Sequence, residues 1–88
     1  MNTTPMSETT PDLSEKAKAF KPGIYKHFKC GMYRAFFVAR NSEALDQEFV
    51  VYQSLENGFV WVRPLDMFLD NVERDGYSGP RFLFVDAK

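Results

Sequence analysis

An Asn57-Gly58 pair stands between two runs of apolar and aromatic residues, at 48–55 and 59–63. Asn-Gly is a strong short-range signal for a β-hairpin, because both central residues of a type I′ turn need positive φ angles. A two-residue loop also fixes which residues face one another across the two strands. It predicts that Tyr52 faces Arg63.

The predicted register divides the side chains of the hairpin between two faces of a sheet. One face carries Val51, Gln53, Leu55, Val60 and Val62, and the other carries Val50, Tyr52, Ser54, Phe59, Trp61 and Arg63. The first face is mostly aliphatic, so we expect it to face the core. The second joins two aromatic rings to a guanidinium, a combination that can stack on a planar ligand or contact a peptide.

Three interpretations of the face that carries Tyr52, Trp61 and Arg63 stay open. It can be a binding site. It can be a structural covering, since small barrels often carry amphipathic aromatics outside and arginine can lie over tryptophan without a ligand. It can also belong to the core, because a one-residue slip of the register turns Trp61 inward. The solvent exposure of Tyr52 and Trp61 distinguishes these cases.

The remaining segments also favour β structure. Runs at 23–28, 32–40 and 81–85 have strand character, with a polar connection at 41–47 and a turn cluster at 74–80. After Pro64, Leu65, Phe68 and Leu69 have helical spacing, which predicts one or two helical turns. The sequence therefore predicts a mainly β fold: a small, strongly bent antiparallel sheet, or SH3-like barrel, of about five strands, with a short helical turn before the last strand.

The N-terminal part differs in composition from the rest. Residues 1–11 are rich in Thr, Pro, Ser and Asn, which predicts disorder. Residues 12–20 predict a short helix that Asp12 caps, with Glu15 at the capping-box position. So short a helix needs Leu13 and Phe20 to pack against the body of the protein. We expect a flexible tail with this short helix at 1–20 and a single small β-barrel domain at 21–88.

Size and charge limit the classes of function. Eighty-eight residues allow one small core. The formal net charge is −1 and no basic stripe is present, so nucleic acid is not the expected partner. The N-terminus lacks the pattern of a secretory signal, no apolar run reaches membrane-spanning length, and a single cysteine forms no intramolecular disulfide. We expect a cytoplasmic monomer without membrane contact.

Metal or catalytic chemistry has little support in the sequence. His27 and Cys30 are the only imidazole and the only thiol. A structural zinc site uses four ligands and a catalytic zinc site usually three, whereas a cysteine nucleophile needs an oriented base. We expect no metal, no cofactor and no catalytic residue.

A polar cluster follows the second predicted strand. Arg40 ends this strand, and Asn41, Ser42 and Glu43 begin the next connection. Loops on a rigid scaffold often carry binding residues, and two guanidiniums, Arg40 and Arg63, suit an anionic group. The alternative is a solvated loop whose polar side chains bond their own backbone.

The motifs that follow Pro22 are typical of one family. They comprise Pro22-Gly23 with Tyr25, His27-Phe28-Lys29, Tyr33, Ala39-Arg40, Ser42-Glu43, Val50-Val51-Tyr52, Trp61-Val62-Arg63-Pro64-Leu65 and Met67-Phe68. With these motifs the chain resembles DUF1653, a bacterial family of unknown function, over residues 22–82. The resemblance implies an SH3-type barrel and no established activity. The family commonly has His and Thr where this chain has Asn41 and Ala44, and Gly where it has Cys30.

Three functions follow as hypotheses. The first is a non-catalytic module that binds a peptide, a protein or a small planar or anionic ligand through Tyr52, Trp61, Arg63 and the loop 40–43. The second is a small enzyme or nucleotide-related accessory that uses Arg40, Glu43 and Arg63. The third is binding of single-stranded nucleic acid by stacking of bases on aromatics, against which the charge balance counts.

Overall fold

The computed structural model describes residues 10–88, so most of the predicted disordered tail lies outside the described residues. The short helix is present as α1 (Glu15–Lys18). Its N-cap is Ser14, whose side chain accepts the amide of Ala17 at 3.1 Å, so the prediction of Asp12 as the cap was wrong. Asp12 pairs instead with Lys18 at 2.7 Å.

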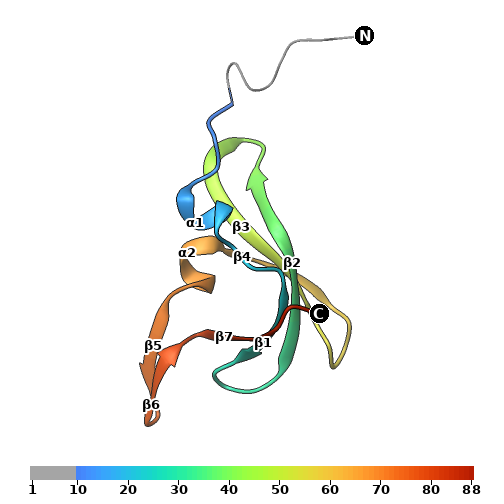
Figure 1. Ribbon diagram of the computed structural model, residues 1–88, viewed down its shortest axis with the longest axis vertical. Coiled ribbons are helices and arrows are strands. Elements are labelled where there is room, and N and C mark those ends of the chain that lie inside the picture. The colour runs from blue at the N-terminus through green and yellow to red at the C-terminus, as the bar shows by residue number, and fades with distance from the viewer. Residues whose placement is uncertain (1–9) are drawn as a thin grey trace.

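Seven strands follow α1, and five of them form one antiparallel sheet. They are β1 (Gly23–His27), β2 (Met32–Asn41), β3 (Ala44–Ser54), β4 (Val60–Pro64), β5 (Asn71–Arg74), β6 (Tyr77–Pro80) and β7 (Phe82–Asp86), with α2 (Leu65–Phe68) after β4. The sheet has the order β4-β3-β2-β1-β7, and β5 and β6 form a separate hairpin (Figure 1). The mainly β, antiparallel prediction is confirmed. The sheet does not close into a barrel, because β4 and β7 remain its two edges.

The β5–β6 hairpin is inserted between α2 and β7, where the sequence predicted only a turn. Arg74 pairs with Tyr77, so the loop is Asp75-Gly76, and both residues have positive φ angles of 51° and 80°. These angles are those of a type I′ turn. The Arg81–Asp70 ion pair, at 2.8 Å, joins the two ends of this insertion.

The Asn57-Gly58 loop is longer than the two residues predicted. The Ser54 amide donates to the Phe59 carbonyl at 2.9 Å, which leaves the four residues 55–58 in the loop. Ser54 Oγ accepts the amides of Glu56 and Asn57, so a side chain at the strand end stabilises this longer turn. As a result Tyr52 faces Trp61 rather than Arg63.

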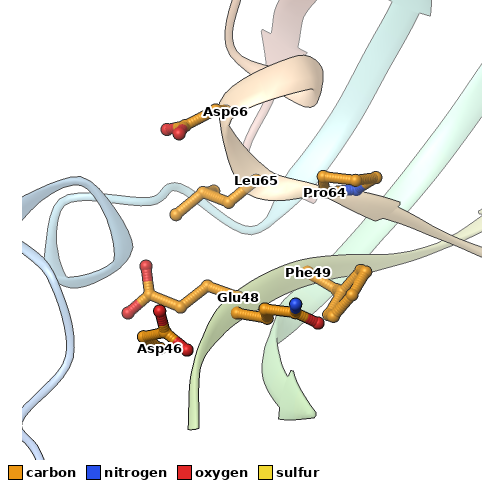
Figure 2. A pocket seen from close by; sticks show the side chains of 7 residues that line it. Asp46, Glu48, Phe49, Pro64, Leu65 and Asp66 are labelled. Atoms are coloured by element: carbon orange, nitrogen blue, oxygen red, sulfur yellow. The ribbon is translucent and has the colours of Figure 1, made fainter. Parts of the chain in front are cut away.

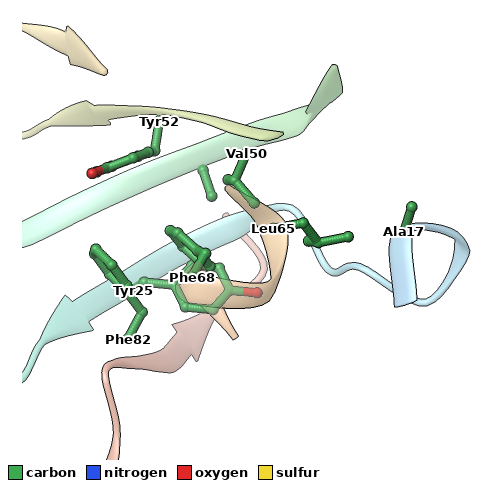
Figure 3. Packing of buried hydrophobic residues seen from close by; sticks show 8 residues of the cluster. Ala17, Tyr25, Val50, Tyr52, Leu65, Phe68 and Phe82 are labelled. Carbon is green, nitrogen blue, oxygen red and sulfur yellow. The ribbon is translucent and has the colours of Figure 1, made fainter. Parts of the chain in front are cut away.

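The shift of register by two residues keeps each side chain on its predicted face, but the prediction of the core face was wrong. Val50 and Tyr52 are buried, whereas Val62 is 63% exposed. The physical reason is the aromatic content of the segments that cover the sheet: Phe68 of α2 and Phe82 of β7 pack against Tyr52 at ring-centroid distances of 5.5 and 5.4 Å. Figure 3 shows these rings gathered beside the strand that carries Val50 and Tyr52.

Both short helices contribute to this core. Ala17 of α1 and Leu65 of α2 are buried, and Leu13 and Phe20 pack against the cluster as the predicted helix required. Residues 10–88 thus cover one face of the sheet and leave the other face uncovered. Within residues 10–88, no helix is long and apolar enough to cross a membrane.

Candidate functional site

A groove of about 280 Å³ opens where the core face meets the edge strand β4. Its lining consists of Tyr33, Tyr52, Ser54, Glu56, Asn57, Trp61 and Arg63. The structure therefore brings together Tyr52, Trp61 and Arg63, three of the residues that the sequence singled out. The other four were missed as site residues, because β2 and the four-residue loop are placed there only by the observed pairing of β2, β3 and β4.

Tyr52 is the floor of the groove. Its ring is part of the core, with 5% of the residue exposed, and packs against Tyr33 at a centroid distance of 5.5 Å. Its hydroxyl accepts a hydrogen bond from Arg63 Nε at 3.1 Å. Tyr52 therefore couples the folded core to the charged end of the groove.

Trp61 is the exposed aromatic wall of the groove. It lies on β4, at the edge of the sheet, and is 50% exposed. Its ring contacts that of Phe59 edge-to-face, at a centroid distance of 6.3 Å. Its position opposite Tyr52 brings the two aromatic residues side by side on one face. A half-exposed indole beside a second ring can stack on a planar or apolar ligand group.

Arg63 supplies a positive charge without a carboxylate partner among the described residues. Its guanidinium lies 5.4 Å from the centre of the Phe82 ring, and its Nη1 contacts Met67 Sδ at 3.4 Å. The ion pairs within residues 10–88 involve other side chains. The ring and the Tyr52 hydroxyl hold the guanidinium in place, so it is positioned to bind an anion at little cost in side-chain entropy.

Two donor groups of the groove have no hydrogen-bond partner within residues 10–88. They are the Tyr33 hydroxyl and the indole N–H of Trp61. Together with Arg63 they make the lining rich in donors, while Glu56 places a carboxylate at the loop end. This arrangement favours a ligand with acceptor or anionic groups near Arg63.

His27 lies near the base of this region but has a structural role. Its Nδ1 accepts the Lys29 amide at 3.1 Å, and its ring packs against Phe82 at 4.9 Å. Burial lowers the pKa of the His27 imidazole, and the positive charges of Arg63, Arg81 and Lys29 lower it further. The imidazole therefore stays neutral to a lower pH than a free histidine.

The cluster 40–43 is not part of the groove. The predicted polar connection at 41–47 is a tight turn of Ser42 and Glu43, because Asn41 already pairs with Ala44 of β3. This turn lies at the end of β3 away from the loop 55–58 (Figure 1). Asn41 Oδ1 accepts the Glu43 amide at 2.8 Å, as expected for a side chain that stabilises its own turn.

The guanidiniums of Arg40 and Arg63 have different partners. Arg40 Nη1 donates to the Pro11 carbonyl, which ties β2 to the N-terminal segment. Arg63 donates to Tyr52 and Met67. An anion clamp made of both arginines therefore does not form in this structure, and Glu43 is on the remote turn.

A larger, acid-lined cavity of about 410 Å³ lies between the start of β3 and the start of α2. Figure 2 shows Asp46, Glu48 and Asp66 around it. Both Glu48 oxygens already accept hydrogen bonds from Ser14, and Asp66 pairs with Lys16 at 3.0 Å. These contacts attach α1 to β3 and to α2. Among residues 10–88, no three His, Cys, Asp or Glu side chains are grouped to hold a metal ion.

Cys30 occupies a backbone conformation that favours glycine, with a φ angle of 148°. Cys30→Gly is expected to stabilise the protein by about 1 kcal/mol, because released strain of about 1–3 kcal/mol exceeds the added chain entropy of glycine. For a domain of this size, the melting temperature should rise by about 4–8 °C. Thermal unfolding under reducing conditions measures it. Cys30→Ala keeps the strain and serves as the control; an equal gain in both variants would contradict this explanation.

The fold and groove define a small, mainly β protein with an open five-stranded sheet and, at one edge, an aromatic groove that carries one guanidinium and one carboxylate. Residues 23–84 match the family model described as "Protein of unknown function (DUF1653)", and the chain belongs to this family. A crystal structure of a DUF1653 protein from Bordetella bronchiseptica is similar, with a TM-score of 0.69 and 33% identity over 78% of this chain and 91% of that chain. No curated protein matches the chain.

Proposed function

We propose that this protein is a non-catalytic binding module whose groove, at Tyr52, Trp61 and Arg63, holds a ligand with an apolar or planar group next to an anionic one. The main support is that the half-exposed indole of Trp61 and the guanidinium of Arg63 line one groove, and that Arg63 forms no ion pair within residues 10–88. Aromatic and arginine side chains contribute most of the binding energy in many interfaces. An exposed thiol at Cys30 supports a cytoplasmic location for such a module.

The enzyme hypothesis has less support from the geometry. It needs Arg40, Glu43 and Arg63 to converge, and the first two lie with the β2–β3 turn while the third lines the groove. Nucleic-acid binding also has less support, because a single arginine lines the groove and counterion release requires several basic contacts.

Trp61→Ala is expected to leave the protein folded and to weaken ligand binding by about thirtyfold or more, the effect of removing an aromatic hot spot. Half of this residue is exposed, so the free energy of unfolding should fall by only about 1–2 kcal/mol. The measurement is NMR chemical-shift mapping with a library of small aromatic carboxylates, followed by calorimetric titration of the hits. Phe37→Ala, an exposed ring on the uncovered face, is the control and should bind normally.

A pair of arginine variants tests the anionic part of the proposal in the same titrations. Arg63→Gln should weaken the binding of aromatic carboxylates by about tenfold, the loss of affinity expected for one charge-assisted contact. Arg40→Gln should bind like the wild type. The opposite result, with Arg40 required and Arg63 dispensable, would place the site at the β2–β3 turn.

A further inference from the structure

Strand β4 is an open edge of the five-stranded sheet. Among the described residues it pairs only with β3. Backbone groups alternate in an antiparallel pair, and the Ser54–Phe59 hydrogen bond sets the phase of this alternation. The N–H and C=O groups of Trp61 and Arg63 therefore point toward β3, while those of Val60 and Val62 point away from it.

The side chains of β4 alternate between the two faces of the sheet. Trp61 and Arg63 line the groove, and Val60 and Val62 are exposed on the uncovered face of the sheet. The edge thus offers backbone groups that do not pair with β3, between the aromatic groove that holds Arg63 and Glu56 on one side and aliphatic side chains on the other. Pro64 ends this edge, because it has no N–H to donate.

We propose that β4 accepts an extended segment of a partner protein as an added antiparallel strand. This inference rests on the proposed function and names its ligand class. Strand addition uses the main chain for affinity and alternate side chains for specificity. The two outward residues, Val60 and Val62, are spaced to exchange backbone hydrogen bonds with two residues of the segment.

The charges at the two ends of the groove define the chemistry of the segment. A residue opposite Arg63 has its side chain in the groove and is acidic. The residue opposite Trp61 is aromatic or apolar. The groove-side residue that follows lies toward Glu56 and is basic. The two intervening residues lie beside Val60 and Val62 and are β-branched.

A second copy of the chain fits this edge less well than a partner. In an antiparallel β4–β4 pair, the outward residues Val60 and Val62 must face one another in some combination. Arg63 then faces Asn57, Phe59 or Trp61 of the other copy, depending on the register. None of these side chains carries a negative charge, so the guanidinium gains no ion pair.

The test uses the full-length chain and a capped synthetic peptide, acetyl-Thr-Glu-Val-Phe-Val-Lys-Thr-amide. Trp61 is the only tryptophan, so its fluorescence reports binding directly. We expect a dissociation constant of about 10–100 µM. Hydrogen exchange followed by NMR should show new protection of the Val60 and Val62 amides, which point away from β3, the only strand that pairs with β4 within residues 10–88.

Backbone methylation of the peptide separates strand addition from groove binding. Methylation of both valine nitrogens should weaken binding by about tenfold or more, because these N–H groups face β4. Methylation of the phenylalanine nitrogen, which points away, is the matched control and should change affinity by less than about threefold. A peptide with its Glu and Lys exchanged should bind about fivefold more weakly, since it places like charges together.

A protein variant gives the reciprocal test. Val62→Pro removes one outward N–H without removing a bond to β3 and should weaken peptide binding by about tenfold. Val62→Thr keeps both the amide and the β-branch and should bind normally. If Val62→Pro fails to fold, the methylated peptides still decide the question.

The outcomes distinguish this inference from the proposed function. If the peptide shifts Trp61 fluorescence without protecting Val60 and Val62, or if valine methylation has no effect, strand addition is overturned and the groove remains a binding site. If aromatic carboxylates bind and the peptide leaves Trp61 fluorescence unchanged up to about 1 mM, strand addition is also overturned and the groove remains a binding site. If neither binds, both proposals fail. If the protein forms a dimer that the peptide dissociates, β4 binds a second copy of the chain, and the proposal of a partner protein is overturned.

Discussion

Replacing Phe68 by alanine is expected to lower the free energy of unfolding by about 3–5 kcal/mol, the usual cost of removing a buried phenylalanine. Phe68 is 1% exposed, and its ring stacks on that of Phe82 at a centroid distance of 4.1 Å. It also contacts Tyr25 and Tyr52, so one side chain of α2 joins rings from β1, β3 and β7. The loss is a large part of the total stability of a small domain.

Urea denaturation followed by circular dichroism measures this change. Phe37→Ala is a control of the same chemistry, because Phe37 is 56% exposed, and it should cost less than about 1 kcal/mol. Equal losses for the two variants would show that the aromatic cluster at Phe68 is not the core.

Gly23→Ala is the second substitution with a large expected effect, a loss of about 3 kcal/mol or more. A Cβ atom at Gly23 would overlap the backbone carbonyl oxygen of Asp86, where β1 meets β7. The φ angle of 148° adds strain for any residue with a side chain. Because the clash is with backbone, no side-chain rotation relieves it, and strands β1 and β7 have to separate at this point.

Gly76→Ala isolates the contribution of strain. Gly76 has a φ angle of 80°, and within residues 10–88 no atom beyond Gly76 and its two chain neighbours lies within 4 Å of the position that an alanine methyl group would take there. We expect a loss of only about 1 kcal/mol. The two variants are compared by thermal unfolding and by the amide spectrum of residues 82–86. A smaller loss at Gly23 than at Gly76 would contradict the close approach of β1 and β7.

The two glycine-containing turns show where sequence patterns predict structure well and where they fail. Asn57-Gly58 and Asp75-Gly76 carry the same local signal, yet only the second forms the two-residue type I′ turn. At the first, Ser54 Oγ accepts hydrogen bonds from two loop amides and extends the loop to four residues. The competing hydrogen bonds of a neighbouring side chain decided the register.

The candidate site was predicted in part. Tyr52, Trp61 and Arg63 could be placed on one face from strand alternation, which survives a shift of register by two. The contribution of Tyr33 depends on the pairing of β2 with β3, where Tyr33 faces Ser54. Residues 40–43 were predicted to contribute to the site, but they lie outside the groove. They precede β3, which begins at Ala44, and the length of this strand separates them from the groove.

The sequence alone determined the strand-rich class of the fold, the helical turn after Pro64 and the division of the β3–β4 side chains between two faces. These properties depend on local alternation and turn chemistry, which act over a few residues. Only the tertiary structure decided which face became the core. Rings from α2 and β7, distant in sequence, pack on Tyr52 and leave Val60 and Val62 outside. Burial depends on what covers a surface, and the identity of the residues on that surface does not fix it.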